Sequence, residues 1–294
     1  MNKVLCFLCH KKTKPLSMMV DFFSKNRNNK IIIHVDSKSD INEFSCFSAY
    51  SNVILLSERH NVLWGGMGMV SATISLLKEA LNHKFDYLFL LSGDDLVCVD
   101  ERYLDDFLNN INLFNLIHYQ DERDGYVNPD NRVKYRYPSF FFKKEANRLD
   151  YLRKLFFKLF KFSRINKEYH NFISSGHRFY KGSQWFGLNH KTVSDIILFL
   201  NENSWYLDLY RDSLIPDEVF FHTLIKYIGI NDLYSDKTKV SDALRYTDWI
   251  TGPDYPRSLD HDDVDKIKKS GCLFARKFKH DTSVHLFDEL RKSV

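Results

Sequence analysis

Residues 86–96, DYLFLLSGDDL, decide the fold: an apolar run is followed by a Ser-Gly turn and two adjacent carboxylates, Asp94 and Asp95. A short continuous apolar run that ends in turn residues is typical of a strand buried on both faces. The same character recurs in strand-like runs at 4–10, 30–36 and 52–57, with helix-like segments at 15–26, 65–84 and 101–110. Strands that alternate with helices predict an α/β fold with a parallel sheet covered on both faces.

Polar side chains follow three of these strands directly, where ligands of parallel sheets bind. They are His10, Asp36, Asp94 and Asp95. Their placement predicts a nucleotide-binding half over residues 1–120. The chain has neither the GxGxxG motif of dinucleotide-binding folds nor the GxxxxGK[ST] motif of P-loop proteins.

The pair Asp94–Asp95 admits two explanations. Adjacent carboxylates at a strand end are a natural site for a divalent metal that holds a phosphate. Alternatively, one of them shapes a donor site by hydrogen bonding, or closes an Asx-type turn at the strand exit.

The second half of the chain, 121–294, is less regular. We expect a further strand at 113–119, a basic aromatic helix over 139–168, and a helix at 190–201. Internal repeats and long linkers are lacking. The sequence therefore predicts one composite domain, 1–294.

Composition excludes several classes of protein. The chain is 44% hydrophobic, and its net charge of +4 is too mild to require nucleic acid. Its five cysteines are scattered, and Cys6 and Cys9 fall on opposite faces of a strand, so we expect neither disulfides nor a metal site there. The first apolar run is too short for a signal peptide or a membrane anchor, which predicts a cytoplasmic protein.

Three short motifs carry candidate chemistry, and each also has a structural explanation. In PDE, 216–218, Glu218 is either part of a helix start or a general base beside a cleft. In WGGMG, 64–68, small residues allow either a tight strand-to-helix crossing or a close approach to a ligand. GSQWF, 182–186, offers polar donors and a stacking face, or a strand with a buried Trp.

Cations gather near the C-terminus. LFARKF, 273–278, contains Arg276 and Lys277, and Arg245 and Arg257 lie in the same segment of the chain. Close together in space, such cations could neutralise a diphosphate without a metal.

Together these stretches resemble the core-2/I-branching family of β-1,6-N-acetylglucosaminyltransferases and the related xylosyltransferases. The similar segments run in order: 31–38, 62–77, 87–96, 182–186, 216–224, 244–249 and 273–278. The resemblance implies a GT-A type fold, in which residues 1–120 bind the nucleotide sugar and residues 121–294 form the acceptor-binding and catalytic half. It also implies inverting transfer of GlcNAc or xylose from a UDP donor to a glycan hydroxyl with a β-linkage. It implies that Glu218 is the base, that no metal or other cofactor is required, and that Lys277 holds the diphosphate with Arg257 or Arg245.

The resemblance also divides the remaining candidates between two subsites. We expect donor contacts from His10, Asp36, Trp64, Gly65, Asp94 and Asp95, and acceptor contacts from Arg136, Ser183, Gln184, Trp185 and Asp217. Two rival functions stay open: a metal-dependent GT-A transferase that uses Asp94 and Asp95, and a non-catalytic module that binds glycans or membranes.

The animal members of the family have a membrane anchor and disulfides, which this sequence lacks. We therefore expect a bacterial cytoplasmic relative that serves surface polysaccharide synthesis, with a growing or lipid-linked glycan as acceptor. Residues 143–167 contain nine Lys or Arg among several Phe. Such a helix either packs its Phe and Leu inward, the interpretation we favour, or lies on the inner face of an anionic membrane.

Overall fold

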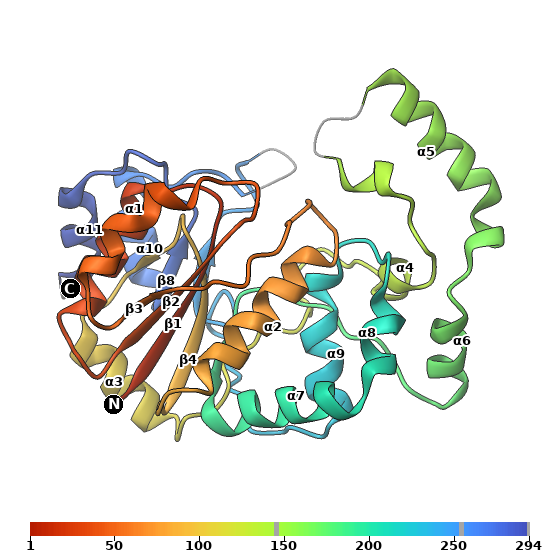
Figure 1. Ribbon diagram of the computed structural model, residues 1–294. Helices are drawn as coiled ribbons and strands as arrows, with labels where there is room; N and C mark the ends of the chain where they lie inside the picture. Colours follow the sequence, from red (N-terminus) through yellow and green to blue (C-terminus); the bar gives the residue numbers. More distant parts are fainter. Residues whose placement is uncertain (144–146, 253–255, 293–294) are drawn as a thin grey trace.

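The computed structural model describes residues 1–143, 147–252 and 256–292. Its centre is a five-stranded sheet in the order β3-β2-β1-β4-β6 (Figure 1). The strands are β3 (Val53–Leu55), β2 (Lys30–Val35), β1 (Lys3–Cys9), β4 (Tyr87–Ser92) and β6 (Gly187–Asn189). The first four are parallel and β6 is antiparallel to β4. The predicted α/β class is confirmed.

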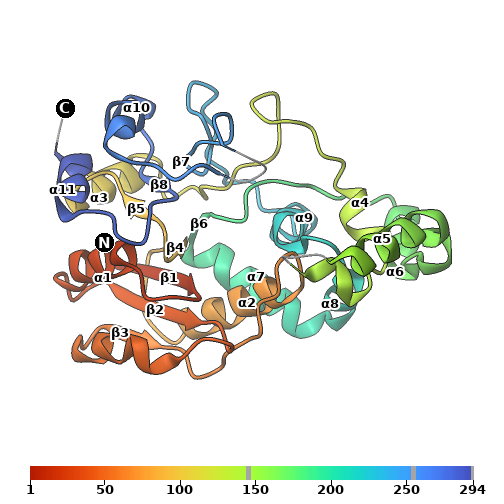
Figure 2. The same cartoon turned by 90° about the horizontal axis from the view of Figure 1, so that it is seen from above.

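Helices cover both faces of this sheet (Figures 1 and 2). One face packs against α1 (Lys14–Ser24) and α11 (Val284–Arg291), and the other against α2 (Gly68–Ala80), α7 (His190–Glu202) and α9 (Phe220–Tyr227). Successive strand residues enter different cores, as the two-residue period of a strand requires. Cys6 lies in the core with α2 and Cys9 in the core with α1, which confirms that they face opposite ways.

A second, three-stranded sheet begins directly after Asp95. Its order is β5 (Leu96–Val97), β8 (Phe274–Arg276) and β7 (Arg245–Thr247), so C-terminal strands pack beside the exit of β4. The helices α3 (Glu101–Asn110) and α10 (Val264–Ser270) and the short turn η5 (His261–Asp263) complete this side, whereas the 3-10 segment η1 (Ile41–Ala49) packs against β3 at the far edge of the central sheet. Because β6 also comes from the second half, the two halves share one sheet.

Two elements predicted around the central sheet differ from the structure. Residues 113–119 make only isolated bridges, at Asn115, Leu116 and Tyr119, because each pairs with a different segment. The helix expected from residue 65 begins at Gly68, since Gly65 has a positive φ of 69° and sits in a turn.

The stretch 139–168 is broken into an arm that projects from the fold. It contains η2 (Ser139–Phe142), α5 (Arg148–Phe160) and η3 (Lys161–Arg164), followed by α6 (Lys167–Ser174). Both views place α5 far from the sheet (Figures 1 and 2). The expectation that its Phe and Leu pack inward is wrong, because on α5 only Phe157 among them is buried.

The helices α4 (Asp130–Val133) and α8 (Ser204–Tyr210) and the turn η4 (Pro216–Glu218) lie between the arm and the sheet. In the described parts of the chain, no helix has both the length and the apolar content to span a bilayer.

Candidate active site

Asp95 is fully buried at the exit of β4, and protein donors surround its carboxylate. Oδ2 accepts a hydrogen bond from the backbone N–H of Ser92 at 3.0 Å, and Oδ1 accepts one from the Ser92 hydroxyl at 2.7 Å. Arg245 pairs with Oδ2, and Nε of Arg276 lies 3.1 Å from Oδ1. Asp95 therefore closes the turn after β4 and anchors two arginines from the second sheet.

Asp94 is half-buried beside Asp95. Burial raises its pKa, and the charge of Asp95 raises it further, whereas His280, Arg276 and His10 act in the opposite direction. The backbone carbonyl of Asp94 accepts a hydrogen bond from the N–H of Phe278 at 2.9 Å. The exit of β4 thus meets the segment after β8, next to Lys277.

His10 and Asp36 stand at the exits of the neighbouring strands. The backbone N–H of Asp36 donates to the carbonyl of Cys9 at 2.8 Å, so the two exits adjoin. The carboxylate of Asp36 is buried and accepts from the backbone N–H of Lys38 at 3.0 Å, while Nζ of Lys38 lies 3.1 Å away. His10 is exposed at the same edge.

Glu218 lies in the turn η4, which Pro216 begins and α9 follows. Its side chain is 26% exposed, and two cations contact its Oε2: Nη2 of Arg132 and Nζ of Lys181, both at 3.3 Å. Neither contact involves Oε1. A carboxylate that is partly exposed and oriented by cations can accept a proton from a bound hydroxyl.

Asp217 precedes Glu218 and has an unusual protonation equilibrium. Burial raises the pKa of its carboxyl group to about 7, and the negative charge of Glu218 contributes, whereas Arg132 and Lys181 act against the shift. Two neighbouring carboxylates with different environments can differ in protonation near neutral pH.

Two glycines let other segments approach Glu218. The carbonyl of Gly65 accepts a hydrogen bond from the N–H of Ile215 at 2.7 Å, which joins the WGGMG turn to η4. Gly182 donates its N–H to the carbonyl of Glu218 at 2.9 Å. A Cβ at position 182 would lie 1.8 Å from the carbonyl oxygen of His118, so only glycine fits.

The segment 182–186 connects the two groups of residues. Its first residue binds Glu218, and the ring of Trp185 lies 4.5 Å from the guanidinium carbon of Arg276 and 5.6 Å from that of Arg245. Trp185 is buried, and its ring packs against the two arginines that pair with Asp95. Beside it, the Nε2 donor of Gln184 is buried with no partner among the described residues.

The C-terminal cations differ in exposure. The side chain of Arg245 is 3% exposed and also donates to the carbonyl of Leu90 at 3.0 Å. Arg257 is 29% exposed and pairs with Asp248 at 3.1 Å and Asp263 at 2.5 Å. The carbonyl of Lys277 accepts from Leu259 N–H at 2.8 Å, so the backbone of Lys277 lies beside the segment that follows Arg257.

The remaining predicted residues are less closely connected. Trp64 is exposed in the turn before α2, and Ser183 is half-buried next to Gly182. Arg136 donates to the carbonyl of Arg211 and has its pKa lowered by burial. Its side chain thus contacts Arg211 after α8 and its backbone contacts Arg164 in the arm, whereas Arg132, four residues earlier, reaches Glu218.

Two functional candidates escaped the sequence patterns. Arg132 and Lys181 pair with Glu218, although neither residue stands in a motif with known chemistry. Lys181 directly precedes GSQWF, which was the available signal. Arg132 lies in a polar stretch that contains no motif, so the sequence gives no sign of its role.

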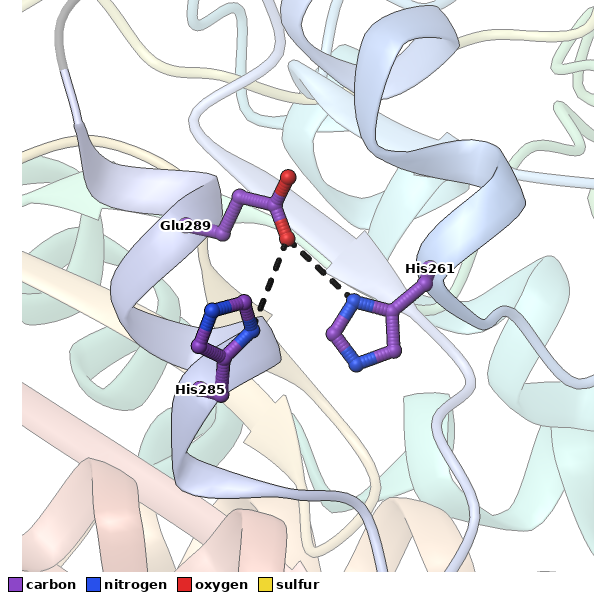
Figure 3. Close-up of side chains that lie close together, drawn as sticks. All are labelled: His261, His285 and Glu289. Carbon is purple, nitrogen blue, oxygen red and sulfur yellow. Dashed lines mark hydrogen bonds and ion pairs between the residues drawn. The ribbon is translucent and has the colours of Figure 1, made fainter.

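Two groups of side chains in the described ranges could offer three ligands to a metal: His118, Asp121 and Asp242, and His261, His285 and Glu289. In the first group, the guanidinium of Arg123 already pairs with the carboxylates that would hold a metal: its Nη2 lies 2.7 Å from Asp121 and 2.8 Å from Asp242. In the second, on η5 and α11, both imidazoles point at Glu289 Oε2 (Figure 3). It is a surface ion-pair cluster, and neither group includes Asp94, Asp95 or Glu218.

Comparisons with known proteins identify the family. No protein among the curated sequences matches the chain. The solved structure of S. aureus TarS is 14% identical over a match that covers 49% of this chain and 26% of TarS, with a TM-score of 0.30. The present chain thus spans about a quarter of TarS. The model of the Core-2/I-Branching enzyme family matches residues 5–269. The GT-A type α/β fold agrees with that match, and the chain belongs to the Core-2/I-branching family of glycosyltransferases.

Proposed function

We propose that this protein is an inverting glycosyltransferase that moves GlcNAc or xylose from a UDP donor to a glycan hydroxyl during surface polysaccharide synthesis. The observation that supports it best is the setting of Glu218. This carboxylate is partly exposed on a tight turn, is oriented by Arg132 and Lys181, and is linked through 182–186 to the exit of β4.

In this mechanism Glu218 accepts the proton of the acceptor hydroxyl. The hydroxyl oxygen attacks C1 of the donor sugar from the face opposite UDP, the bond from C1 to the diphosphate breaks, and a β-linkage forms. A general base of this kind contributes about 10²–10⁴ in rate.

The diphosphate is held without a metal, by Lys277 and Arg257. Arg257 is preferred to Arg245 because its side chain is 29% exposed, whereas that of Arg245 is 3% exposed. A diphosphate at Arg257 would compete with its present partners, Asp248 and Asp263. Both oxygens of Asp95 accept protein hydrogen bonds, so a metal would have to displace donors there. Asp94, next to His10 and Arg276, is left to bind sugar hydroxyls.

The acceptor lies against Asp217, Ser183 and Gln184. The unpartnered Nε2 of Gln184 supports this assignment, because a buried donor without a partner gains from a ligand oxygen. Asp217, with its pKa near 7, can donate or accept a hydrogen bond at the same place.

The test is UDP release from a panel of UDP-sugars by the purified protein in excess EDTA, with and without a glycan acceptor. Release from one sugar in EDTA supports the proposal and names the donor. If no UDP is released in EDTA and Mn²⁺ restores the release, a metal-dependent transferase in which Asp94 and Asp95 are ligands is favoured. If no UDP is released under any condition but the protein still binds glycans, a non-catalytic module is favoured.

A further inference from the structure

The helix α5 turns its apolar face away from the protein. Residues three or four positions apart share one face of a helix. Here Leu149, Leu152, Phe156 and Leu159 share a face, and each of these side chains is between 54% and 64% exposed. Contiguous apolar surface of this kind on a soluble fold marks an interaction site.

The orientation of α5 is fixed by the opposite face of the helix. Phe157 is buried there, with its ring 4.8 Å from that of Phe141 and 5.3 Å from that of Tyr137. Asp150 is also buried, and its carboxylate pairs with Nζ of Lys143 at 3.2 Å. The apolar face therefore points outward because different residues make the inward contacts.

Positive charge flanks this outward face. Residues 148–164 contain six Lys or Arg, and the one acidic residue among them is the buried Asp150. The six cations are Arg148, Arg153, Lys154, Lys158, Lys161 and Arg164. A hollow of about 630 Å³ beside α5 is lined by Tyr151, Leu152 and Leu155 together with Arg148, Lys154 and Lys158, so cations and apolar side chains share one surface.

We infer that α5 lies in the plane of an anionic lipid membrane, with Leu149, Leu152, Phe156 and Leu159 below the headgroups and the cations among the phosphates. An exposed apolar face bordered by Lys and Arg is the pattern of an interfacial helix. A second copy of this chain fits the face less well, because it would bring a second set of cations against the first.

The arm joins the fold beside the candidate base. Tyr135 bridges to Ile165, and the N–H of Arg136 donates to the carbonyl of Arg164 at 2.9 Å, which closes the base of the arm. Arg132, just before this junction, contacts Glu218. A membrane bound to α5 would thus lie on the side of the acceptor-binding half. The consequence that a lipid-linked acceptor arrives from that surface rests on the proposed function, whereas membrane binding itself does not.

The experiment is co-sedimentation of the full chain with vesicles of phosphatidylcholine alone or with phosphatidylglycerol, without any nucleotide sugar. Wild type binds the vesicles that contain phosphatidylglycerol, and 0.5 M salt weakens binding. L152S/F156S lowers the partition coefficient at least about tenfold, since each side chain loses its transfer into the apolar phase. K158E with R148E also lowers it, through charge.

The matched control is L198S, because Leu198 on α7 is 58% exposed and outside the arm. It leaves vesicle binding unchanged, and equal melting temperatures show that all variants fold. Three results would overturn the inference: no binding by wild type, equal binding to both vesicle types, or a dimer in sedimentation velocity that L152S/F156S dissociates. UDP release in solution is measured separately, so failure of membrane binding and failure of the proposed function are distinguishable.

Discussion

Replacing Asp95 with Asn should destabilise the fold, whereas the same change at Asp94 should not. Asp95 is fully buried, and its oxygens accept from the Ser92 N–H, the Ser92 hydroxyl, Arg245 and Arg276. Asn keeps one acceptor oxygen but turns an amide donor toward an arginine and leaves the buried charge of Arg245 without a counter-ion.

The magnitude follows from these contacts. Removing one partner of a buried ion pair costs about 3–5 kcal/mol. For a chain of this size, that lowers the melting temperature by roughly 6–10 °C. Asp94 is half-buried and its pKa is raised by burial, so its charge is already unfavourable. D94N should change the free energy of unfolding by less than about 1 kcal/mol.

The assay is urea unfolding of wild type, D94N and D95N, each with and without Mn²⁺. The account predicts a loss confined to D95N and no effect of Mn²⁺. In D95N/R245M the loss should be smaller than the sum of the two single losses, because the charges are removed together. Equal losses in D94N and D95N, or a stabilisation by Mn²⁺ that both variants abolish, would refute the structural role of Asp95.

Three further results are expected. G182A should yield little folded protein, because its Cβ would meet the His118 carbonyl at 1.8 Å, while G125A, with nothing within 4 Å, should express normally. The free energy of unfolding of wild type relative to that of D217N should fall as pH rises from about 4 to 7, since folded Asp217 keeps its proton over that range while the unfolded chain releases it. The comparison with D217N is needed because burial lowers the pKa values of His34 and His222, which stabilise the fold as pH rises. A difference between the two proteins that stays constant across urea titrations at each pH would contradict the prediction. Transfer activity should persist in EDTA, and its loss there with recovery in Mn²⁺ would contradict the metal-free site.

Local sequence signals predicted the sheet well. Unbroken apolar runs predict strands β1, β2 and β4. A strand that is buried on both faces is apolar at every position, rather than at every second position. The segment 113–119 has the same apolar character but forms no strand. Its partners are separate segments at Gly182, Gly187 and Leu233, and sequence pattern alone does not show which segments compete for a strand.

The sequence motifs single out candidate residues of the site but not the pairings among them. Glu218 and Asp95 stand in short motifs, whereas Arg132 and Lys181 reach Glu218 only because the chain folds back over long separations. The stretch 139–168 is predicted as one basic aromatic helix, and α5 is the longest helix within it. The prediction of its inward face is wrong because Phe157 packs against Phe141 and Tyr137, which lie outside α5 and whose contacts the sequence of the helix does not reveal.

The most direct test of the central claim compares Glu218→Gln with wild type for UDP release in the presence of acceptor and for UDP binding by calorimetry. Gln matches the size of Glu and keeps a hydrogen-bond acceptor but does not take up the proton. The account predicts a loss of turnover of about 10²–10⁴ with UDP affinity unchanged. Turnover near that of wild type would contradict it and remove Glu218 from the role of base.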